Sequence, residues 1–184
     1  MRATPPYPGQ GGPEPSAPRC VFVTGPRGAG KTRWLLGQIR NIEGSQPGAR
    51  CAVLLAEEGR TRIGGTAPGA RGTAVRRLLL PCPCCAALAD LPGALSELAA
   101  IARPATIFVE VPAVAASGLL AEFDRVLGWP REVAVCLDRA WANAMREREL
   151  SPFHTALLDI ADHVVPGPAS GETPAAPPIH NDAA

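Results

Sequence analysis

The pattern of hydrophobic and polar positions divides the chain into short apolar runs and longer segments of helical spacing. Uninterrupted apolar runs are typical of strands buried on both faces. They predict strands at 20–24, 51–56, 106–110, 132–137 and 163–165. The segment 74–80, in which two arginines interrupt the apolar residues, is a further candidate for a short strand. Apolar residues three and four positions apart predict helices at 32–40, 86–102, 119–127, 138–150 and 153–161. In the second of these helices the apolar positions are Leu88, Leu91, Leu95, Leu98 and Ile101.

This alternation of strands and helices predicts the fold class. Crossover connections between such strands are right-handed and leave the strands parallel. We therefore expect an α/β protein in three layers, with a mostly parallel sheet and helices on both faces. Ligands of such sheets bind beyond the carboxyl ends of the strands. Residues that directly follow a predicted strand are the first candidates for a functional site.

The clearest candidate is the segment from Gly25 to Thr32, which reads Gly-Pro-Arg-Gly-Ala-Gly-Lys-Thr. It fits the phosphate-binding loop pattern G-x-x-x-x-G-K-[ST] and lies between a predicted strand and a predicted helix, as that pattern requires. Glycines let backbone N–H groups turn towards a polyphosphate, and the helix start favours negative charge. We expect a P-loop NTPase fold. The expected nucleotide-binding residues are Gly25, Gly28, Ala29, Gly30, Lys31, Thr32 and Arg33.

Lys31 and Thr32 carry the chemistry of this loop. A lysine at this position reaches the β- and γ-phosphates, and the hydroxyl of the next residue binds Mg²⁺. Lys31 is the only lysine among 18 cationic residues, which indicates a specific need for a compact ammonium group. We expect Lys31 to be a catalytic residue and to lie in an exposed loop rather than in the core.

Acidic residues follow two of the predicted strands. Glu110 ends the run 106–110, where P-loop enzymes place an acidic residue that holds Mg²⁺ or its water. We expect Glu110 to be a catalytic residue and to share the ion with Thr32. Glu57 follows the run 51–56 and is the third expected magnesium residue. The alternative for Glu110 is an ordinary acidic residue where a buried strand reaches the surface.

Three of the six cysteines form the cluster Cys82-Pro83-Cys84-Cys85. Thiolates are soft ligands that suit Zn²⁺ or a similar ion, and the predicted helix start after the cluster favours the thiolate form. Three thiolates leave a tetrahedral ion one ligand short. Water, a distant residue or a second chain must then supply the fourth ligand. His154 and His163 are candidates, although a lone histidine is more often a packing residue.

Composition limits the classes of partner. The net charge of +1 gives no argument for nucleic acid or an anionic membrane. No apolar run approaches the ~20 residues that span a bilayer, and no secretory signal is visible. We therefore expect a cytoplasmic protein whose cysteines are thiols or metal ligands. Pro- and Gly-rich tails at 1–19 and 166–184 are expected to be disordered, around one nucleotide-binding domain at 20–165. The remaining cysteines lie in or beside predicted strands and are expected to be small buried hydrophobes: Cys20, Cys51 and Cys136.

These features together resemble the CobW-type metallochaperone GTPases, which are relatives of HypB and UreG. The resemblance rests on the GxxGxGKT loop, Glu-x-Gly after the second predicted strand, the CxCC cluster and a strand that ends in glutamate. The order and approximate spacing match over about residues 20–165. The resemblance implies a GTPase that delivers zinc or a similar metal ion. It places Cys82, Cys84 and Cys85 as metal ligands, and Lys31, Thr32 and Glu110 at the nucleotide and Mg²⁺.

The chain also departs from this family. The family's Asn-Glu/Asp-x-Gly-Glu is here 56–60, Ala-Glu-Glu-Gly-Arg, and its Glu-x-x-Gly is here 110–113, Glu-Val-Pro-Ala. The guanine-reading Asn-Lys-x-Asp is replaced by Pro-Gly-Pro-Ala at 166–169. Asp138 does match the family's Val-Val-Asp segment. We expect weak discrimination between GTP and ATP, and weak or impaired turnover.

The resulting hypothesis is a protein that couples binding and hydrolysis of GTP or ATP, with Mg²⁺, to the handling of zinc or a related ion. Bound nucleotide would order residues 57–73 and the turn after Glu110, and so change the geometry around the cysteines between them. Its partners would be a nucleoside triphosphate, a metal ion, a client metalloprotein and a second copy of the chain, but not nucleic acid or a membrane. Two alternatives are a small ATP-dependent kinase, which leaves the CxCC cluster unexplained, and a relative that binds nucleotide or metal without hydrolysis.

Overall fold

The computed structural model describes residues 17–56, 73–78, 86–147 and 150–166. Its strands are β1 (Arg19–Thr24), β2 (Cys51–Leu55), β3 (Ala74–Arg77), β4 (Thr106–Glu110), β5 (Arg131–Cys136) and β6 (His163–Val165). Its helices are α1 (Lys31–Ser45), α2 (Ala86–Ala102), α3 (Ala116–Val126), α4 (Arg139–Glu147) and α5 (Pro152–Asp159), with a short 3-10 helix η1 (Ala113–Ala115) before α3. Each of these elements except η1 overlaps one that the hydrophobic pattern predicts.

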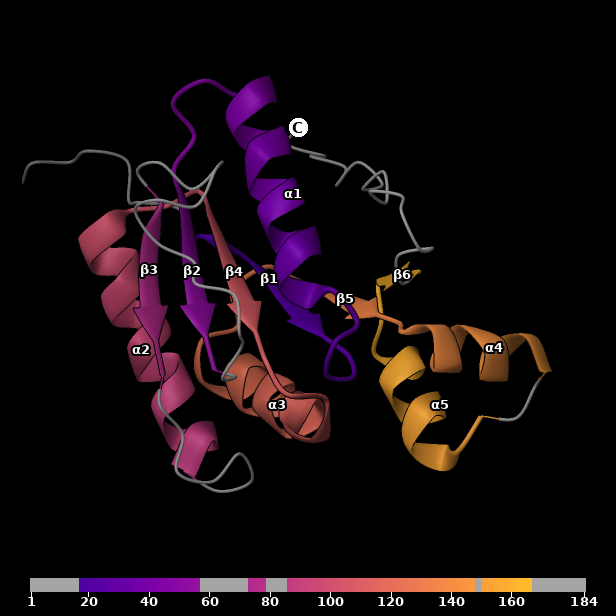
Figure 1. Cartoon of the computed structure of the whole chain (residues 1–184). Helices are drawn as coiled ribbons and strands as arrows, with labels where there is room; N and C mark the ends of the chain where they lie inside the picture. Colours follow the sequence, from indigo (N-terminus) through magenta and orange to yellow (C-terminus); the bar gives the residue numbers. More distant parts are fainter. Residues whose placement is uncertain (1–16, 57–72, 79–85, 148–149, 167–184) are drawn as a thin grey trace, which may run out of the picture.

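The described strands form one six-stranded sheet in the order β3-β2-β4-β1-β5-β6. Every neighbouring pair is parallel. In this register Val23 of β1 lies between Glu110 of β4 and Ala134 of β5. Figure 1 shows the loop from β1 to α1 at the edge to which the strand arrows point. The carboxyl ends of the three central strands therefore meet at this loop.

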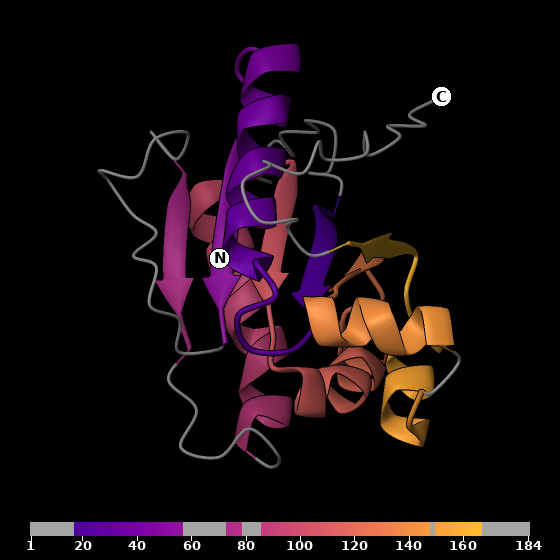
Figure 2. The same cartoon turned by 45° about the vertical axis from the view of Figure 1, so that its right-hand side comes forward.

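Helix α1 covers one face of the sheet. Its buried residues Trp34, Leu35 and Ile39 pack in one cluster with Val21 and Val23 of β1. Burying a side chain such as Leu or Ile contributes about 1.5–3 kcal/mol. Both views of the molecule show α1 along this face, with its first turn at the carboxyl edge of the strands (Figures 1 and 2). This packing holds the start of α1 beside the end of β1.

Helices α2 and α3 cover the opposite face. Leu95 of α2 and Phe123 of α3 pack there with Phe22 of β1 and Ile107 of β4. The rings of Phe22 and Phe123 meet edge to face, with centroids 5.0 Å apart, an arrangement that adds to the gain from burial. Helices thus lie on both faces, and the prediction of a three-layer α/β fold is confirmed.

Helices α4 and α5 lie side by side beyond β5 and β6, as both views show (Figures 1 and 2). Trp141 of α4 contacts His154 of α5 edge to face, with ring centroids 4.2 Å apart. The backbone N–H of His154 also donates to the side chain of Ser151, which caps α5. His154 is therefore engaged in capping and packing.

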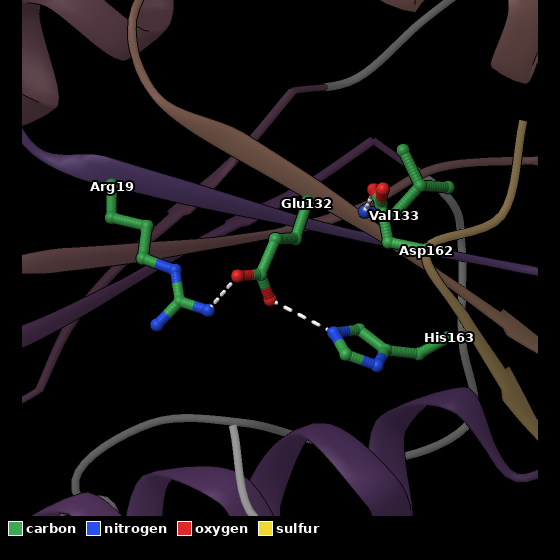
Figure 3. A network of polar contacts seen from close by, with 5 residues as sticks. All are labelled: Arg19, Glu132, Val133, Asp162 and His163. Carbon is green, nitrogen blue, oxygen red and sulfur yellow. Dashed lines mark hydrogen bonds and ion pairs between the residues drawn. The ribbon is translucent and has the colours of Figure 1, made fainter. Parts of the chain in front are cut away.

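A network of charged side chains joins the amino ends of β1, β5 and β6 (Figure 3). Glu132 accepts from Arg19 and lies 3.0 Å from His163 Nε2. Burial alone would raise the pKa of the Glu132 carboxyl, but the hydrogen bonds from Arg19 and His163 outweigh it and lower that pKa. Nearby, Asp162 accepts from the backbone N–H of Val133 at 2.8 Å. The network lies at the edge opposite the phosphate loop, so His163 has a partner there.

Two details of the observed helices differ from what the hydrophobic pattern indicates. Helix α1 runs to Ser45 rather than to residue 40, because Ile42 continues its apolar face and packs partly buried against the α1 cluster. In α2, Ile101 continues the series of apolar positions but does not join the core, since this side chain is 81% exposed. Each step of three residues falls about 60° short of a full turn, so the series from Leu95 through Leu98 turns out of the core at Ile101.

Candidate functional site

The backbone of the phosphate loop depends on its glycines. Gly25 has a φ of 134° and Gly30, which precedes α1, has a φ of 84°. Residues that carry a side chain rarely adopt such backbone angles. A Cβ on Gly25 would also lie 2.1 Å from the carbonyl oxygen of Cys136 in β5. Only glycine fits at this position, where the loop crosses directly over the end of the neighbouring strand.

Lys31 begins α1 and folds back under the loop. Its Nζ donates to the carbonyl of Gly25 at 2.9 Å and to that of Pro26 at 3.0 Å. The residue is only 5% exposed, so the expectation that Lys31 lies exposed is wrong. The cause is the loop itself, because its first carbonyls provide acceptors for the ammonium group. A positive charge is thereby held beneath the backbone that would surround a phosphate.

Thr32 and Glu110 form a pair beside the loop. Thr32 Oγ1 lies 3.0 Å and 3.2 Å from the two carboxylate oxygens of Glu110. Glu110 is 4% exposed and reaches this position because β4 pairs directly with β1. A hydroxyl and a carboxylate are oxygen ligands of the kind that Mg²⁺ prefers. These two residues therefore suit a Mg²⁺ ion next to a bound polyphosphate.

The turn after Glu110 stays attached to β1. The backbone N–H of Val111 donates to the carbonyl of Val23 at 3.0 Å. Pro112 then has a φ of −64° and precedes η1, and a proline has no N–H to donate. The segment that leads from Glu110 to η1 therefore starts at the carboxylate that contacts Thr32, beside the phosphate loop.

Other predicted residues are placed as follows. Ala29 is buried in the loop, and its N–H donates to the carbonyl of Pro26 at 3.3 Å. Arg33 is exposed in the first turn of α1. Asp138 follows β5 at the same edge of the sheet, and its side chain accepts from the N–H of Trp141 at 2.8 Å, which caps α4. Glu57 lies outside the described residues.

The cysteines of the strands are buried, as expected. Cys20 and Cys136 are 0% exposed and Cys51 is 4% exposed. Burial raises the pKa of each of these thiols: to about 12 for Cys20, about 11 for Cys51 and about 12 for Cys136. At Cys136 the charge of Lys31 opposes this effect and that of Glu110 adds to it. A buried thiol that stays protonated is a poor metal ligand, so these three are packing residues.

The cluster Cys82, Cys84 and Cys85 lies outside the described residues. The chain leaves the carboxyl end of β3 at Arg77 and enters α2 at Ala86, directly after the cluster. Among the described residues, no group of three or more His, Cys, Asp or Glu side chains is arranged to hold a metal ion. Any thiolate site therefore has to come from the segment between β3 and α2.

The motif leaves position 27 unspecified, so sequence reasoning gives Arg27 no role. In the structure Arg27 is exposed in the loop between Pro26 and Gly28. Its side chain makes no hydrogen bond or ion pair with the residues that the structure describes. The sequence clue is its position, since Arg27 is the one cationic residue among the four variable positions of the motif.

A glycine loop between a parallel strand and a helix, with a lysine beneath it and a hydroxyl–carboxylate pair beside it, defines a nucleotide-binding P-loop protein. The family model of the CobW/HypB/UreG nucleotide-binding domain matches residues 19–165. The chain belongs to this family and is a P-loop protein of the GTPase type. No curated protein and no solved structure matches it. In the part of the chain that the structure describes, no helix is long and apolar enough to cross a membrane.

Proposed function

We propose that this protein binds GTP or ATP with Mg²⁺ and uses the nucleotide to control the handling of zinc or a related thiophilic ion. The observation that carries the nucleotide part is the contact between Thr32 and Glu110 beside the loop that encloses Lys31. Lys31 and Thr32 begin the helix that follows β1, and Glu110 ends the neighbouring strand β4. The three residues therefore lie at the carboxyl edge of the strands, where sheets of this kind bind ligands.

Each side chain would have a distinct task. Lys31 would bind the β- and γ-phosphates through charge-assisted hydrogen bonds, while the loop N–H groups surround them. Thr32 and Glu110 would hold Mg²⁺, which when bound neutralises negative charge on the phosphate oxygens. Gly25 would keep the loop close to β5, because its missing side chain leaves room for the Cys136 carbonyl.

The metal part of the proposal rests on Cys82, Cys84 and Cys85. Three thiols within four residues are a suitable donor set for Zn²⁺ or a similar ion. This segment starts from β3, at the edge of the sheet that also carries Glu110. The open fourth position would admit a ligand of a client metalloprotein or of a second copy of the chain. Nucleotide binding would act on this segment through the turn that follows Glu110.

Replacing Glu110 by glutamine should reduce the contribution of Mg²⁺ to nucleotide binding. Glutamine keeps the size of the side chain and an acceptor for Thr32, but it removes the negative charge that a divalent ion needs. We expect affinity for the triphosphate to fall about tenfold or more with Mg²⁺ and to change little in EDTA. Calorimetry under both conditions measures this.

The matched control for this experiment is Glu97→Gln. Glu97 is exposed on α2, where it forms an ion pair with Arg76 of β3. Its replacement should leave both affinities unchanged. An equal benefit from Mg²⁺ in wild type and Glu110→Gln would remove Glu110 from the ion site.

Discrimination between GTP and ATP should be weak. The sequence Pro-Gly-Pro-Ala stands where the family reads guanine with Asn-Lys-x-Asp, so it offers no side-chain acceptor for the base. Sites that hydrogen-bond a substrate group reject analogues strongly, and sites without such groups do not. We expect dissociation constants for Mg²⁺–GTP and Mg²⁺–ATP within about a hundredfold of each other. A larger preference would show that another segment reads guanine.

A further inference from the structure

The phosphate loop carries a second cation besides Lys31. Arg27 is exposed between Pro26 and Gly28, and its guanidinium makes no hydrogen bond or ion pair with the residues that the structure describes. Some other arginines at the surface are paired with carboxylates, as Arg125 is with Glu122 and Arg131 with Asp124. Arg27 thus differs from these surface arginines in keeping its donors available.

The position of Arg27 is set by the residues on either side. Lys31 Nζ lies 3.0 Å from the carbonyl of Pro26, the residue bonded to Arg27. A lysine in this motif reaches the β- and γ-phosphates. The backbone of Arg27 therefore begins one residue away from the group that would bind the outer phosphates. Gly28 follows with a φ of 87°, a turn that holds the backbone on both sides of Arg27 within the loop.

The chemistry of the side chain suits a terminal phosphate. A guanidinium group presents several donors in one plane, and it binds phosphate oxygens in pairs. The terminal phosphate of a triphosphate carries more free oxygens and more charge than the inner ones. A long cationic side chain that starts beside the outer phosphates gains most from this group.

We propose that Arg27 binds the terminal phosphate of a nucleoside triphosphate and gives the site its preference for triphosphate over diphosphate. This inference rests on the proposed function, since it requires the nucleotide to bind in the phosphate loop. It assigns the two loop cations different tasks. Lys31 binds either nucleotide, whereas Arg27 responds to the presence of the third phosphate.

The test compares two dissociation constants for each protein, both measured by calorimetry with Mg²⁺. The probes are a non-hydrolysable GTP analogue and GDP. Arg27→Ala should reduce the ratio of triphosphate to diphosphate affinity about tenfold or more, the effect expected from losing a charge-assisted hydrogen bond. Its affinity for GDP should stay within about threefold of wild type, which also shows that the loop is folded. Arg27→Lys should recover part of the ratio, because it keeps the charge but not the planar fork.

The matched control is Arg50→Ala. Arg50 is exposed before β2, at the opposite edge of the sheet, so this variant removes the same charge far from the loop and should keep the wild-type ratio. An unchanged ratio in Arg27→Ala, or an equal loss of both affinities, would overturn the inference while leaving the proposed function in place. A wild-type protein that binds neither probe would overturn the proposed function as well.

Discussion

Replacing Lys31 by alanine should weaken binding of Mg²⁺–GTP and Mg²⁺–ATP by about a hundredfold or more. The variant loses contacts of Lys31 with two phosphates, and a charge-assisted hydrogen bond is worth about 1.5–3 kcal/mol. The fold should survive. The two carbonyls that Lys31 serves, those of Gly25 and Pro26, belong to the loop and not to the sheet, and leaving such a group without a donor costs about 1–3 kcal/mol.

Because Lys31 is buried, binding and folding have to be measured separately. Circular dichroism and thermal unfolding report the fold, and calorimetry reports the affinity. Lys31→Met is the matched variant, since it keeps an unbranched side chain of similar length without the charge. Both variants should unfold cooperatively and bind nucleotide poorly. Wild-type affinity in a folded Lys31→Ala protein would show that the assignment of the phosphate loop is wrong.

The second large effect concerns the cysteine cluster. We expect the protein to take up one thiophilic metal ion through Cys82, Cys84 and Cys85. Three thiolates repel one another, and a divalent cation offsets that repulsion and keeps the thiols deprotonated. Affinity should therefore rise with pH through the range in which the thiols lose their protons. If two chains share the ion, metal should also drive dimerisation.

Cobalt substitution tests this site directly. Thiolate-to-cobalt absorption bands should appear in the wild type and should weaken in Cys82→Ser, Cys84→Ser and Cys85→Ser. Cys51→Ala is the control, because Cys51 is buried in β2 with a pKa raised to about 11. Light scattering with and without zinc measures whether the metal ion makes the protein dimerise. A reduced wild-type protein that binds no zinc or cobalt at micromolar free metal would remove the metal-handling part of the proposal.

Much of the fold could be predicted because the signals are local. Apolar runs such as the one that ends in Glu110 are short and uninterrupted, and they correspond to strands of the central sheet. The fixed positions of the loop motif likewise predict a strand, a turn and a helix in that order. Parallel pairing then follows from the alternation of strands and helices. The contact between Thr32 and Glu110 follows from this pairing, because Thr32 comes after β1 and Glu110 ends the neighbouring strand β4.

Other features depend on three-dimensional packing that no local pattern contains. The burial of Lys31 arises from the path of the loop carbonyls, whereas its residue type alone suggests exposure. The need for glycine at position 25 is increased by the carbonyl of Cys136, which is far away in sequence. Ile101 fits a helical series but lies beyond the edge of the core. The role that we assign to Arg27 rests on its position next to Pro26, whose carbonyl accepts a hydrogen bond from Lys31.

The central claim is that nucleotide and metal binding are coupled in one protein. Titration calorimetry of the reduced protein with Mg²⁺–GTP, in the absence and presence of one equivalent of zinc, measures this most directly. We predict binding at a single site, with a dissociation constant that zinc changes about fivefold or more, the size of a typical coupling between sites. ATP and GDP titrations under the same conditions identify the preferred nucleotide. No binding of any nucleotide, or an affinity that zinc leaves unchanged, would contradict the account.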